Sequence, residues 1–506
     1  MVSIPPKAPI LRFCGLVRNL KVEISAGNGE KMYFCNIFSD EKMYFDNRNS
    51  SESLISDKKN VIYSCFRLLV ENSGRSAMQR LLTEKLVEWK NSKYRKPLIL
   101  WGVRQVGKTW LLKDFGEKHF ENCVYISFYN NRKMAEIFDE DYDPKRILKR
   151  ISIELHTKIE PDKTLVIFDE VQSAMKVVES LKYFCEDARE YAVVAAGSLL
   201  GVALHEGISF PVGKVDELRL RPMNFKEFLM AMDEPELAGF IDDWKNPDVS
   251  SFQHKYADLL RLYFYLGGMP EVVSHYIENH DLAEARDIQL SILSQYEGDF
   301  SKHVQPSQLP RINMTWKAIP LQLAKENKKF FFGKVKEGGR MKDFEIALQW
   351  LLDAGLIHKV HKVTKPGMPL KAYIDFAAFK LYLVDIGLLG ALSELDSRSI
   401  MNGNTIFTEF KGALAEQYVL QELIANKKYT PFYYSGEKST YETDFVIQRA
   451  SDIIPIEVKA EENLKSKSLK FYCEKFSPAF AVRTSMAKAD DQGWMVNIPL
   501  WAIGSL

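Results

Sequence analysis

Short apolar runs and helix-like stretches alternate along the chain from residue 97 to residue 220. Most of the apolar runs are separated by segments in which apolar residues recur with helical spacing. Buried strands that alternate with helices are typical of a mainly parallel sheet with helices on both faces. The sequence therefore predicts an α/β domain whose strands fall at residues 97–101, 123–128, 164–168, 192–196 and 215–220.

The pattern differs on both sides of this domain. A regular helical spacing of leucines begins only after Met78. Residues 1–77 are therefore expected to be a poorly defined extension, or translation starts at Met78 and they are not part of the native protein. Residues 225–310 are predicted to be helical, and residues 310–363 to form helices followed by short strands. Residues 407–506 return to a mixed α/β pattern.

Composition places the chain among ordinary globular proteins. Its 506 residues suggest about three domains, and 46% are hydrophobic and 27% charged. The formal net charge of +1 identifies no partner by itself. Six scattered cysteines without a C-x-x-C pair indicate neither a zinc site nor a disulfide framework, and they suit the cytoplasm. No apolar run is long enough for a bilayer and the N-terminus lacks a signal-peptide pattern, so no membrane partner is expected.

A phosphate-binding motif follows the first predicted strand of the α/β domain. The segment lies between apolar residues 98–101 and a helix-like run at 110–115, and it matches G-x-x-x-x-G-K-[ST]. Glycines let the backbone approach phosphates, and amide groups point at the anion. Lys108 would reach the β- and γ-phosphates of ATP, and Thr109 would ligate Mg²⁺. The predicted nucleotide-binding residues of this loop are Gly102, Val103, Arg104, Gln105, Val106, Gly107, Lys108 and Thr109.

Two carboxylates end the predicted strand at 164–168. Asp169 is expected to hold Mg²⁺, usually through water, and Glu170 to polarise the attacking water as general base. Ser198, after the next strand, lies where such ATPases keep a polar residue that senses the γ-phosphate. Carboxylates at a strand end and a serine in a turn are also common without catalysis. An arginine finger is less clear, since surface charge explains each candidate equally well: Arg189, Arg219 and Arg221.

Several segments resemble a prokaryotic group of AAA-type P-loop ATPases. They are G-V-R-Q-V-G-K-T at 102–109, F-D-E-V-Q at 168–172, A-G-S-L-L at 196–200, F-P-V-G-K at 210–214, R-P-M-N-F-K-E-F at 221–228, Y-L-G-G-M-P-E at 265–271 and F-K-L-Y-L-V-D-I-G-L at 379–388. The resemblance covers the chain from about residue 78 to the end. It implies an ATPase, a winged-helix segment and a C-terminal domain similar to PD-(D/E)xK nucleases.

The fold class expected from pattern and resemblance together is multidomain α/β. It comprises a P-loop NTPase parallel sheet with helices on both faces, a helical and winged-helix middle, and a restriction-endonuclease-like α/β C-terminal domain. The expected parts are the extension at 1–77, the AAA-type ATPase domain at 78–230, a helical region at 231–310, a basic winged-helix-like region at 311–400 and the nuclease-like domain at 401–506.

One carboxylate near the C-terminus falls on an apolar helix stripe. In the helix predicted at 410–424, Glu416 shares a face with apolar residues three, four and seven positions later. A buried carboxylate is costly unless it is paired or bound to a metal. The strands predicted next carry Asp444 and then Glu457 and Lys459, and the last two share one strand face.

These four residues match the PD-(D/E)xK pattern in order and secondary structure, although Thr443 rather than proline precedes Asp444. Asp444 and Glu457 would bind Mg²⁺, which prefers oxygen ligands. Glu416 would ligate a second metal or position a metal-bound water, and Lys459 would stabilise the nucleophile or the pentavalent phosphate. An amphipathic edge strand would explain the I-E-V-K segment taken alone, and folds of this kind can be retained for binding only.

Positive charge gathers in the middle of the chain. Residues 325–380 carry twelve Lys and Arg against six Asp and Glu. A helix at about 344–354 followed by a strand at 355–360 is typical of a winged helix, and its basic surface suits contact with DNA phosphates. A solvated basic face is the alternative explanation.

Two functions are compatible with these patterns. The first is an ATP-gated, metal-dependent DNA-processing enzyme, in which ATP hydrolysis controls a C-terminal endonuclease centre. The second is a nucleotide-dependent regulatory switch that binds DNA or a protein partner without cutting. Because AAA-type rings take a finger arginine from a neighbouring subunit, a homo-oligomer is a further open alternative.

Overall fold

The computed structural model divides the chain into two compact units, residues 1–75 and residues 76–506. In the first unit it describes four strands: β1 (Ile10–Phe13), β2 (Leu20–Ser25), β3 (Tyr33–Ile37) and β4 (Met43–Phe45). They pair antiparallel in chain order. In the second unit it describes residues 78–203, 210–325, 328–397, 408–425, 429–436, 441–460 and 466–506.

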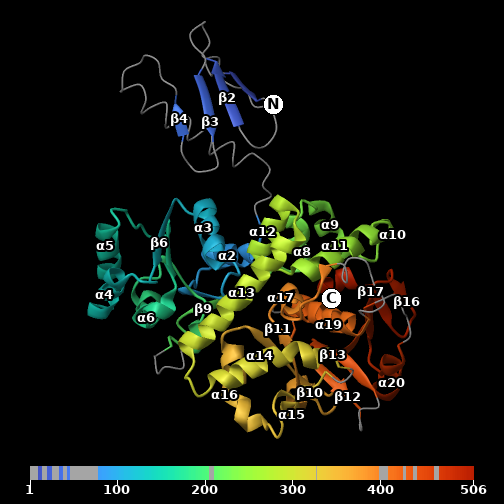
Figure 1. Ribbon diagram of the computed structural model, residues 1–506. Helices are drawn as coiled ribbons and strands as arrows, with labels where there is room; N and C mark the ends of the chain where they lie inside the picture. The colour runs from blue at the N-terminus through green and yellow to red at the C-terminus, as the bar shows by residue number, and fades with distance from the viewer. Residues whose placement is uncertain are drawn as a thin grey trace. The chain divides into compact units, whose positions relative to one another are not determined.

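A five-stranded parallel sheet forms the first part of the larger unit, as the sequence predicts (Figure 1). Its order is β6-β7-β8-β5-β9, so the phosphate-loop strand β5 lies between β8 and β9. The strands are β5 (Leu98–Trp101), β6 (Asn122–Ser127), β7 (Thr164–Asp169), β8 (Ala192–Gly197) and β9 (Asp216–Arg219).

Helices cover both faces of this sheet. Along β7, Leu165 and Ile167 pack into one core, whereas Val166 and Phe168 pack into the other. Alternate side chains of a strand point to opposite faces, so an uninterrupted apolar strand needs a cover on each side. The covering helices are α2 (Leu82–Asn91), α3 (Lys108–His119), α4 (Arg132–Glu140), α5 (Pro144–Glu154), α6 (Met175–Asp187) and α7 (Leu200–Ala203), with the short 3-10 turn η1 (Val171–Ser173).

A helical region follows, as the sequence predicts for residues 225–310. Asn224 caps its first helix with a capping box that includes Glu227. The helices are α8 (Phe225–Ala231), α9 (Pro235–Phe240), α10 (Pro247–Ser250), α11 (Gln253–Leu266), α12 (Pro270–Asn279), α13 (Leu282–His303) and α14 (Leu309–Leu323), with η3 (Ile241–Asp243).

The rest of the unit is built on an eight-stranded mixed sheet of order β11-β10-β12-β13-β14-β15-β17-β16. Its strands are β10 (Ile357–Val363), β11 (Ile374–Leu383), β12 (Phe432–Ser435), β13 (Glu442–Arg449), β14 (Asp452–Val458), β15 (Val482–Ser485), β16 (Asp490–Asp491) and β17 (Val496–Pro499). The helical elements of this part are α15 (Phe332–Val335), α16 (Met341–Asp353), η4 (Leu370–Tyr373), α17 (Ile386–Leu392), α19 (Thr408–Ala425), α20 (Lys467–Phe476) and η7 (Leu500–Ser505).

This sheet runs across the boundary that the sequence analysis placed after residue 400. The β10–β11 hairpin of the winged-helix-like region joins the C-terminal strands, because Lys362 of β10 pairs in parallel with Tyr433 of β12. The expected boundaries at 230, 310 and 400 stay predictions. None of the helices in the described ranges has the length and apolar composition needed to cross a membrane.

The turn within residues 265–271 contacts the end of the segment at residues 379–388. The Asp385 carboxylate accepts a hydrogen bond from Gly268 N at 2.7 Å and caps α17 through Leu388 N at 3.0 Å. Gly267 has φ +72°, and a Cβ there would collide with Asp385. Burial raises the pKa of Asp385 to about 6. The glycines of residues 265–271 are therefore needed because the 379–388 segment packs directly on their backbone.

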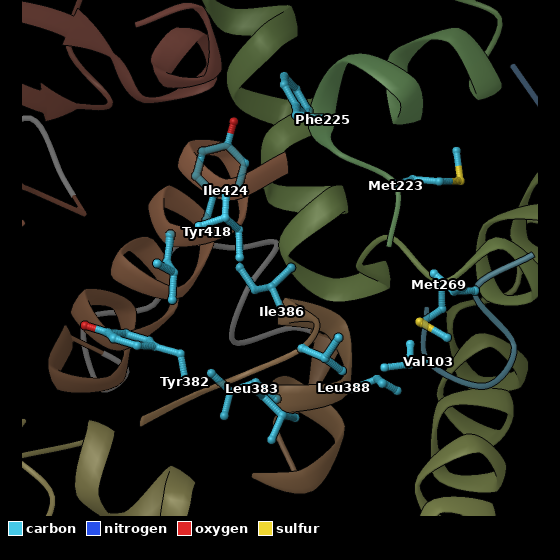
Figure 2. Close-up of a cluster of buried hydrophobic side chains, with 14 of the residues drawn as sticks. Val103, Met223, Phe225, Met269, Tyr382, Leu383, Ile386, Leu388, Tyr418 and Ile424 are labelled. Atoms are coloured by element: carbon cyan, nitrogen blue, oxygen red, sulfur yellow. The ribbon is translucent and has the colours of Figure 1, made fainter. Parts of the chain in front are cut away.

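The phosphate loop shares a core with the C-terminal part. Val103 belongs to the same buried cluster as Met269 of the glycine turn and Leu388 of α17 (Figure 2). The cluster continues to Tyr418 and Ile424 of α19. The loop, α17 and α19 therefore belong to one closely packed interior.

A buried carboxyl between α8 and α19 makes the stability of the protein depend on pH. Glu422 Oε1 accepts a hydrogen bond from Phe225 N at 2.8 Å, and burial, followed by the charge of Glu227, raises the Glu422 pKa from 4.5 to about 8. The folded protein therefore holds this proton more tightly than the unfolded chain does. This contribution to stability is complete below about pH 4.5 and is lost as pH rises through 8, and the full loss is about 5 kcal/mol.

We expect Glu422→Gln to reduce the fall in the free energy of unfolding as pH rises. Glutamine keeps the hydrogen-bond acceptor and cannot ionise. Urea unfolding at pH 6, 7, 8 and 9 would measure it, with the exposed Glu84→Gln as the matched control. If the free energy of unfolding changes with pH in the same way for wild type and Glu422→Gln, Glu422 does not titrate in this range.

Candidate functional site

The nucleotide loop owes its shape to its glycines. It leaves β5 at Trp101 and enters α3 at Lys108. Gly107 has φ +92°, which side-chain-bearing residues rarely adopt, and a Cβ on Gly102 would lie 2.7 Å from Leu220 O. The loop can therefore wrap at the carboxyl end of β5 with its amide groups at the start of a helix, where anions bind.

Lys108 joins the loop to the end of β8. Its Nζ donates to Gly102 O and Val103 O, each at 2.9 Å, and to Ser198 Oγ at 3.1 Å. Burial lowers the pKa of Lys108 to about 8, while the carboxylates of Glu170 and Asp169 act in the opposite direction. A phosphate held here would place a negative charge beside the buried ammonium group. The structure thus places Ser198 beside Lys108, and its sensor role stays a prediction.

The proposed magnesium ligands lie in contact. Thr109 Oγ1 donates to Asp169 Oδ2 at 2.5 Å, and Tyr125 OH donates to the same oxygen at 3.1 Å. Mg²⁺ in nucleotide sites takes one or two protein oxygens and completes its shell with phosphate oxygens and water. The hydroxyl of Thr109 and the carboxylate of Asp169 are such oxygens, so this donor set fits the ion.

Glu170 is held by its neighbours at the end of β7. Its backbone has φ +55°, its N–H donates to Asp169 Oδ1 at 2.9 Å, and Gln172 Nε2 donates to its Oε2. Gly197 at the end of β8 leaves room for the Gln172 amide, which a Cβ there would overlap. The F-D-E-V-Q and A-G-S segments are therefore in direct contact, and Glu170 is oriented by a side chain from its own turn.

The sequence did not indicate that α13 covers the nucleotide loop. Arg104 Nη1 lies 2.7 Å from Asp299 Oδ1, Gln105 Nε2 donates to Gln295 Oε1 at 2.9 Å, and Tyr296 OH donates to Arg104 O at 3.0 Å. In Figure 1, α13 lies between the five-stranded sheet and the eight-stranded sheet. These partners are about 190 residues apart in the chain, and no local pattern marks them.

A buried arginine that precedes α2 and β5 also supports the loop. Arg80 Nη1 donates to Val106 O at 3.0 Å, and its Nη2 donates to Arg221 O at 2.5 Å. Its Nε lies 3.2 Å from Glu227 Oε1 in a buried ion pair. This contact was missed because a lone arginine in a helical pattern is usually a surface residue.

Of the three finger candidates, Arg189 lies away from the nucleotide loop. It precedes β8 and donates to Cys185 O at 2.6 Å, at the opposite end of the strand from Ser198. Arg219 is the last residue of β9 and Arg221 follows it, and both line a cavity together with Gly102 and Ser198.

In the C-terminal part, Glu416 is buried as its helical position predicts. Lys328 Nζ contacts its Oε1, Lys380 Nζ lies 3.5 Å from its Oε2, and Tyr382 OH donates to Oε2 at 2.9 Å. Although burial raises the pKa of Glu416, the two lysines lower it below the usual value. Lys380 also pairs with Glu442 at 2.6 Å. The sequence did not identify these lysines as partners, since both belong to the basic stretch that was expected at the surface.

Asp444 and Glu457 lie on the adjacent strands β13 and β14, next to the pair Phe445 and Ile456. Asp444 Oδ2 accepts from Val458 N at 2.8 Å, and burial together with the charge of Glu416 raises the Asp444 pKa. Lys459 follows the last residue of β14, and its Nζ lies 2.9 Å from Glu457 Oε1.

No three His, Cys, Asp or Glu side chains in the described part of the chain gather as a metal site would require. Of the three carboxylates in the predicted nuclease-like site, Glu416 and Asp444 share one electrostatic environment, whereas Glu457 pairs with Lys459. The nuclease-like roles of these residues, including Mg²⁺ at Asp444 and Glu457, stay predictions.

The parallel sheet and the glycine-containing loop between β5 and α3 have the arrangement of a P-loop nucleotide-binding domain. In agreement, residues 94–229 match the model of a family described as AAA domain. Residues 257–399 and 411–503 match two families that are each described as a domain of unknown function, DUF8612 and DUF4143. These matches leave the winged-helix and nuclease-like assignments unconfirmed. No curated protein matches the chain significantly.

Three solved structures are similar at low identity. A Signal Transduction ATPase with Numerous Domains protein with a tetratricopeptide repeat sensor from Pyrococcus horikoshii is 12% identical, with a TM-score of 0.25, over 71% of this chain and 47% of that protein. AMPPCP-bound DnaA from Aquifex aeolicus is 14% identical, with a TM-score of 0.23, over 55% and 87%. A single-residue variant of RuvB from Thermotoga maritima is 15% identical, with a TM-score of 0.24, over 55% and 88%. These TM-scores are too low to support an inference about this chain.

Proposed function

We propose that this protein is an Mg²⁺-dependent ATP-hydrolysing switch. The observation that carries the proposal is the contact of Thr109 with Asp169 beside a lysine bonded to Ser198. Lys108 would hold the β- and γ-phosphates, and Thr109 and Asp169 would hold the metal ion that neutralises phosphate charge. Glu170, one residue beyond Asp169, would take the proton of the attacking water.

Nucleotide state would reach the C-terminal part through shared packing. Val103 contacts the core that contains Leu388 of α17, and α13 bonds to the loop through Asp299. A loop that tightens around a triphosphate would thus displace elements on which the C-terminal sheet rests. This arrangement supports a switch that reports bound nucleotide to a distant surface.

The surface that would respond is the basic region of residues 325–380. Its exposed cations suit phosphate contacts, and Phe376 on β11 is 70% exposed among them. Two of the twelve cations are unavailable, because Lys328 and Lys380 are committed to Glu416. The exposed ones are Lys325, Lys334, Lys336, Arg340, Lys342, Lys365 and Lys371. We infer DNA as the partner from this charge.

Lys108→Ala should weaken ATP binding roughly ten- to hundredfold and abolish measurable hydrolysis, because it removes a charge-assisted contact to the phosphates. Titration with a fluorescent ATP analogue and phosphate release in Mg²⁺ would measure both effects. The matched control is Lys118→Ala, an exposed lysine on the same helix, which should behave as wild type. Unchanged ATP affinity in Lys108→Ala would refute the site.

The coupling to DNA has its own test. Fluorescence anisotropy of a labelled duplex, with the full chain in ATP plus Mg²⁺ and in ADP plus Mg²⁺, should give different affinities. Lys108→Ala should bind equally in both. Equal affinity of the wild type for DNA in ATP and in ADP would rule out the coupling, and an absence of DNA binding would leave a protein as the partner.

A nuclease centre is the second candidate function. It is favoured by Glu457 Oε2, a buried carboxylate oxygen without a hydrogen-bond partner among the described residues, which suits a bound cation. Cleavage of duplex DNA in Mg²⁺ or Mn²⁺ that disappears in Asp444→Ala would support it. Absence of cleavage, or cleavage unchanged in Asp444→Ala, would leave the non-cutting switch.

A further inference from the structure

An exposed phenylalanine lies where the β10–β11 hairpin departs from regular pairing. Lys362 pairs with Asp375 across the two strands. The preceding residue, His361, pairs with Phe379 rather than with Phe376, which a continued register would place opposite it. The residues between Asp375 and Phe379 therefore form a bulge. A bulge changes the direction of a side chain, and here it moves Phe376 out of the ladder, with 70% of its surface exposed.

Phe376 extends a row of aromatic rings that begins in the core. The buried rings of Phe330 and Phe379 stack with their centres 6.1 Å apart. The His361 ring lies 6.0 Å from Phe379 and 5.7 Å from Phe376, edge to face in both cases. Phe376 thus rests against a ring that the core holds in place, while most of its own surface stays exposed. A ring held in this way is pre-organised for a flat ligand.

Lysines accompany the aromatic rings of this hairpin. Lys365 and Lys371 lie in the connection between β10 and β11, and both are exposed. Lys365 Nζ lies 4.6 Å from the centre of the Tyr373 ring, and Lys359 Nζ lies 4.2 Å from that of Phe379. Surfaces that bind single-stranded nucleic acid combine positive charge with aromatic rings in the same way.

The carboxylates near the hairpin do not cancel its charge. Residues 357–376 carry four lysines and one carboxylate, Asp375. The Asp375 carboxylate accepts a hydrogen bond from Ala377 N at 3.0 Å, so it fastens the backbone of the bulge. Burial lowers the pKa of Lys359, and the charge of Glu345 acts in the opposite direction. The hairpin therefore keeps an excess of positive charge that can contact phosphates.

A phenyl ring distinguishes single strands from duplexes. It has no hydrogen-bond donor or acceptor, so it cannot read the base edges that a duplex presents in its grooves. Within a duplex the faces of the bases are covered by their neighbours. In a single strand these faces are free to stack on an aromatic ring. An exposed ring between lysines therefore favours unstacked bases over paired ones.

We propose that the β10–β11 hairpin binds single-stranded nucleic acid, with a base stacked on Phe376 and phosphates held by Lys365 and Lys371. The inference rests on the proposed function, in which the basic region contacts DNA, and it names the form of nucleic acid that this region takes. A duplex would contact the same lysines through its backbone and would leave the ring uncovered. Single strands are therefore the preferred ligand.

The test uses fluorescence anisotropy with the full chain in ATP plus Mg²⁺. Its labelled ligands are a single strand of DNA, the RNA strand of the same sequence and the DNA duplex of the same length. Wild type should bind the single strands more tightly than the duplex. Phe376→Ala should lower the affinity for single strands roughly five- to hundredfold and remove most of this preference. Phe376→Trp should keep the preference, because its ring also stacks.

The matched control is Phe240→Ala, which removes an exposed ring at the end of α9. It should bind all the ligands as wild type does. Salt dependence separates stacking from charge. Phe376→Ala removes no charge, so the slope of log affinity against log salt concentration should equal that of wild type. Lys371→Ala should reduce this slope by about one, because one phosphate contact is lost. A reduced slope in Phe376→Ala would contradict stacking.

The remaining outcomes separate this proposal from the proposed function. If the ratio of single-strand to duplex affinity is the same in wild type and Phe376→Ala, the proposal is overturned and DNA binding through charge stands. If all affinities fall together with the melting temperature, Phe376 is structural and the proposal is also overturned. Tighter binding of RNA with the same dependence on Phe376 would support stacking and make RNA the partner. If wild type binds none of the ligands, the DNA partner of the proposed function fails as well.

Discussion

Glu170→Gln should lower the rate of ATP hydrolysis roughly 10²- to 10⁴-fold while ATP still binds. Glutamine keeps the shape of the side chain and loses the base that would accept a proton from water. Gln172 donates to Glu170 Oε2 and the Glu170 N–H is bonded to Asp169, so the substituted side chain should keep its position. The substitution leaves the residues that would hold the phosphates and Mg²⁺ unchanged, namely Lys108, Thr109 and Asp169. The variant should therefore still bind ATP.

Single-turnover hydrolysis and nucleotide titration would separate the two effects. Glu186→Gln, an exposed carboxylate on α6, is the matched control. A variant that hydrolyses ATP at the wild-type rate would remove Glu170 as the base. A variant that fails to bind ATP would show instead that Glu170 shapes the nucleotide site.

Glu416→Ala should lower the free energy of unfolding by about 3 to 5 kcal/mol. The side chain is buried, and two lysines and the Tyr382 hydroxyl converge on it. Its removal leaves Lys380, which is fully buried, with Glu442 as the remaining carboxylate at ion-pair distance. The cost arises mainly because Lys328 and Lys380 together then carry more positive charge than the remaining carboxylate balances, so Lys380→Met combined with Glu416→Met should recover much of the loss.

Urea unfolding followed by circular dichroism would measure these changes. Glu474→Ala, on the exposed side of α20, is the matched control and should change stability by less than about 0.5 kcal/mol. A loss for Glu416→Ala as small as that of the control would contradict the buried network. A loss that appears only when Mg²⁺ is present would indicate that Glu416 stabilises the protein through a metal ion.

The ATPase site was predictable because its chemistry is local. Within Gly102 to Thr109 the motif itself specifies a turn with φ > 0, a lysine at a helix start and a hydroxyl beside it. The apolar strand that precedes Asp169 fixes where that carboxylate emerges from the sheet. The packing of Glu416 was predictable for a related reason, since helical spacing alone puts it on the buried stripe.

The partners of these groups were not predictable from one sequence. Lys328 and Lys380 lie in a basic stretch of the kind that is usually exposed, and only the tertiary structure brings both lysines to Glu416 of α19. Likewise, the contact of α13 with Arg104 depends on how a helix some 190 residues later crosses the loop. Ion pairs between residues so far apart in the chain form only when the folded elements pack together, so no local sequence pattern marks them.

The sequence by itself determined three features of the protein: the phosphate loop, the polar residues at the ends of β7 and β8, and the order of strands and helices. Each of them depends on a few neighbouring residues and on the fixed period of a helix or strand. The tertiary structure decided which elements meet at that loop. It brought α13 over Arg104, packed Val103 against α17, and placed Arg219, Arg221 and His358 around one cavity. Those contacts arise from burying apolar surface shared by the whole unit, and that burial has no signature in any single segment.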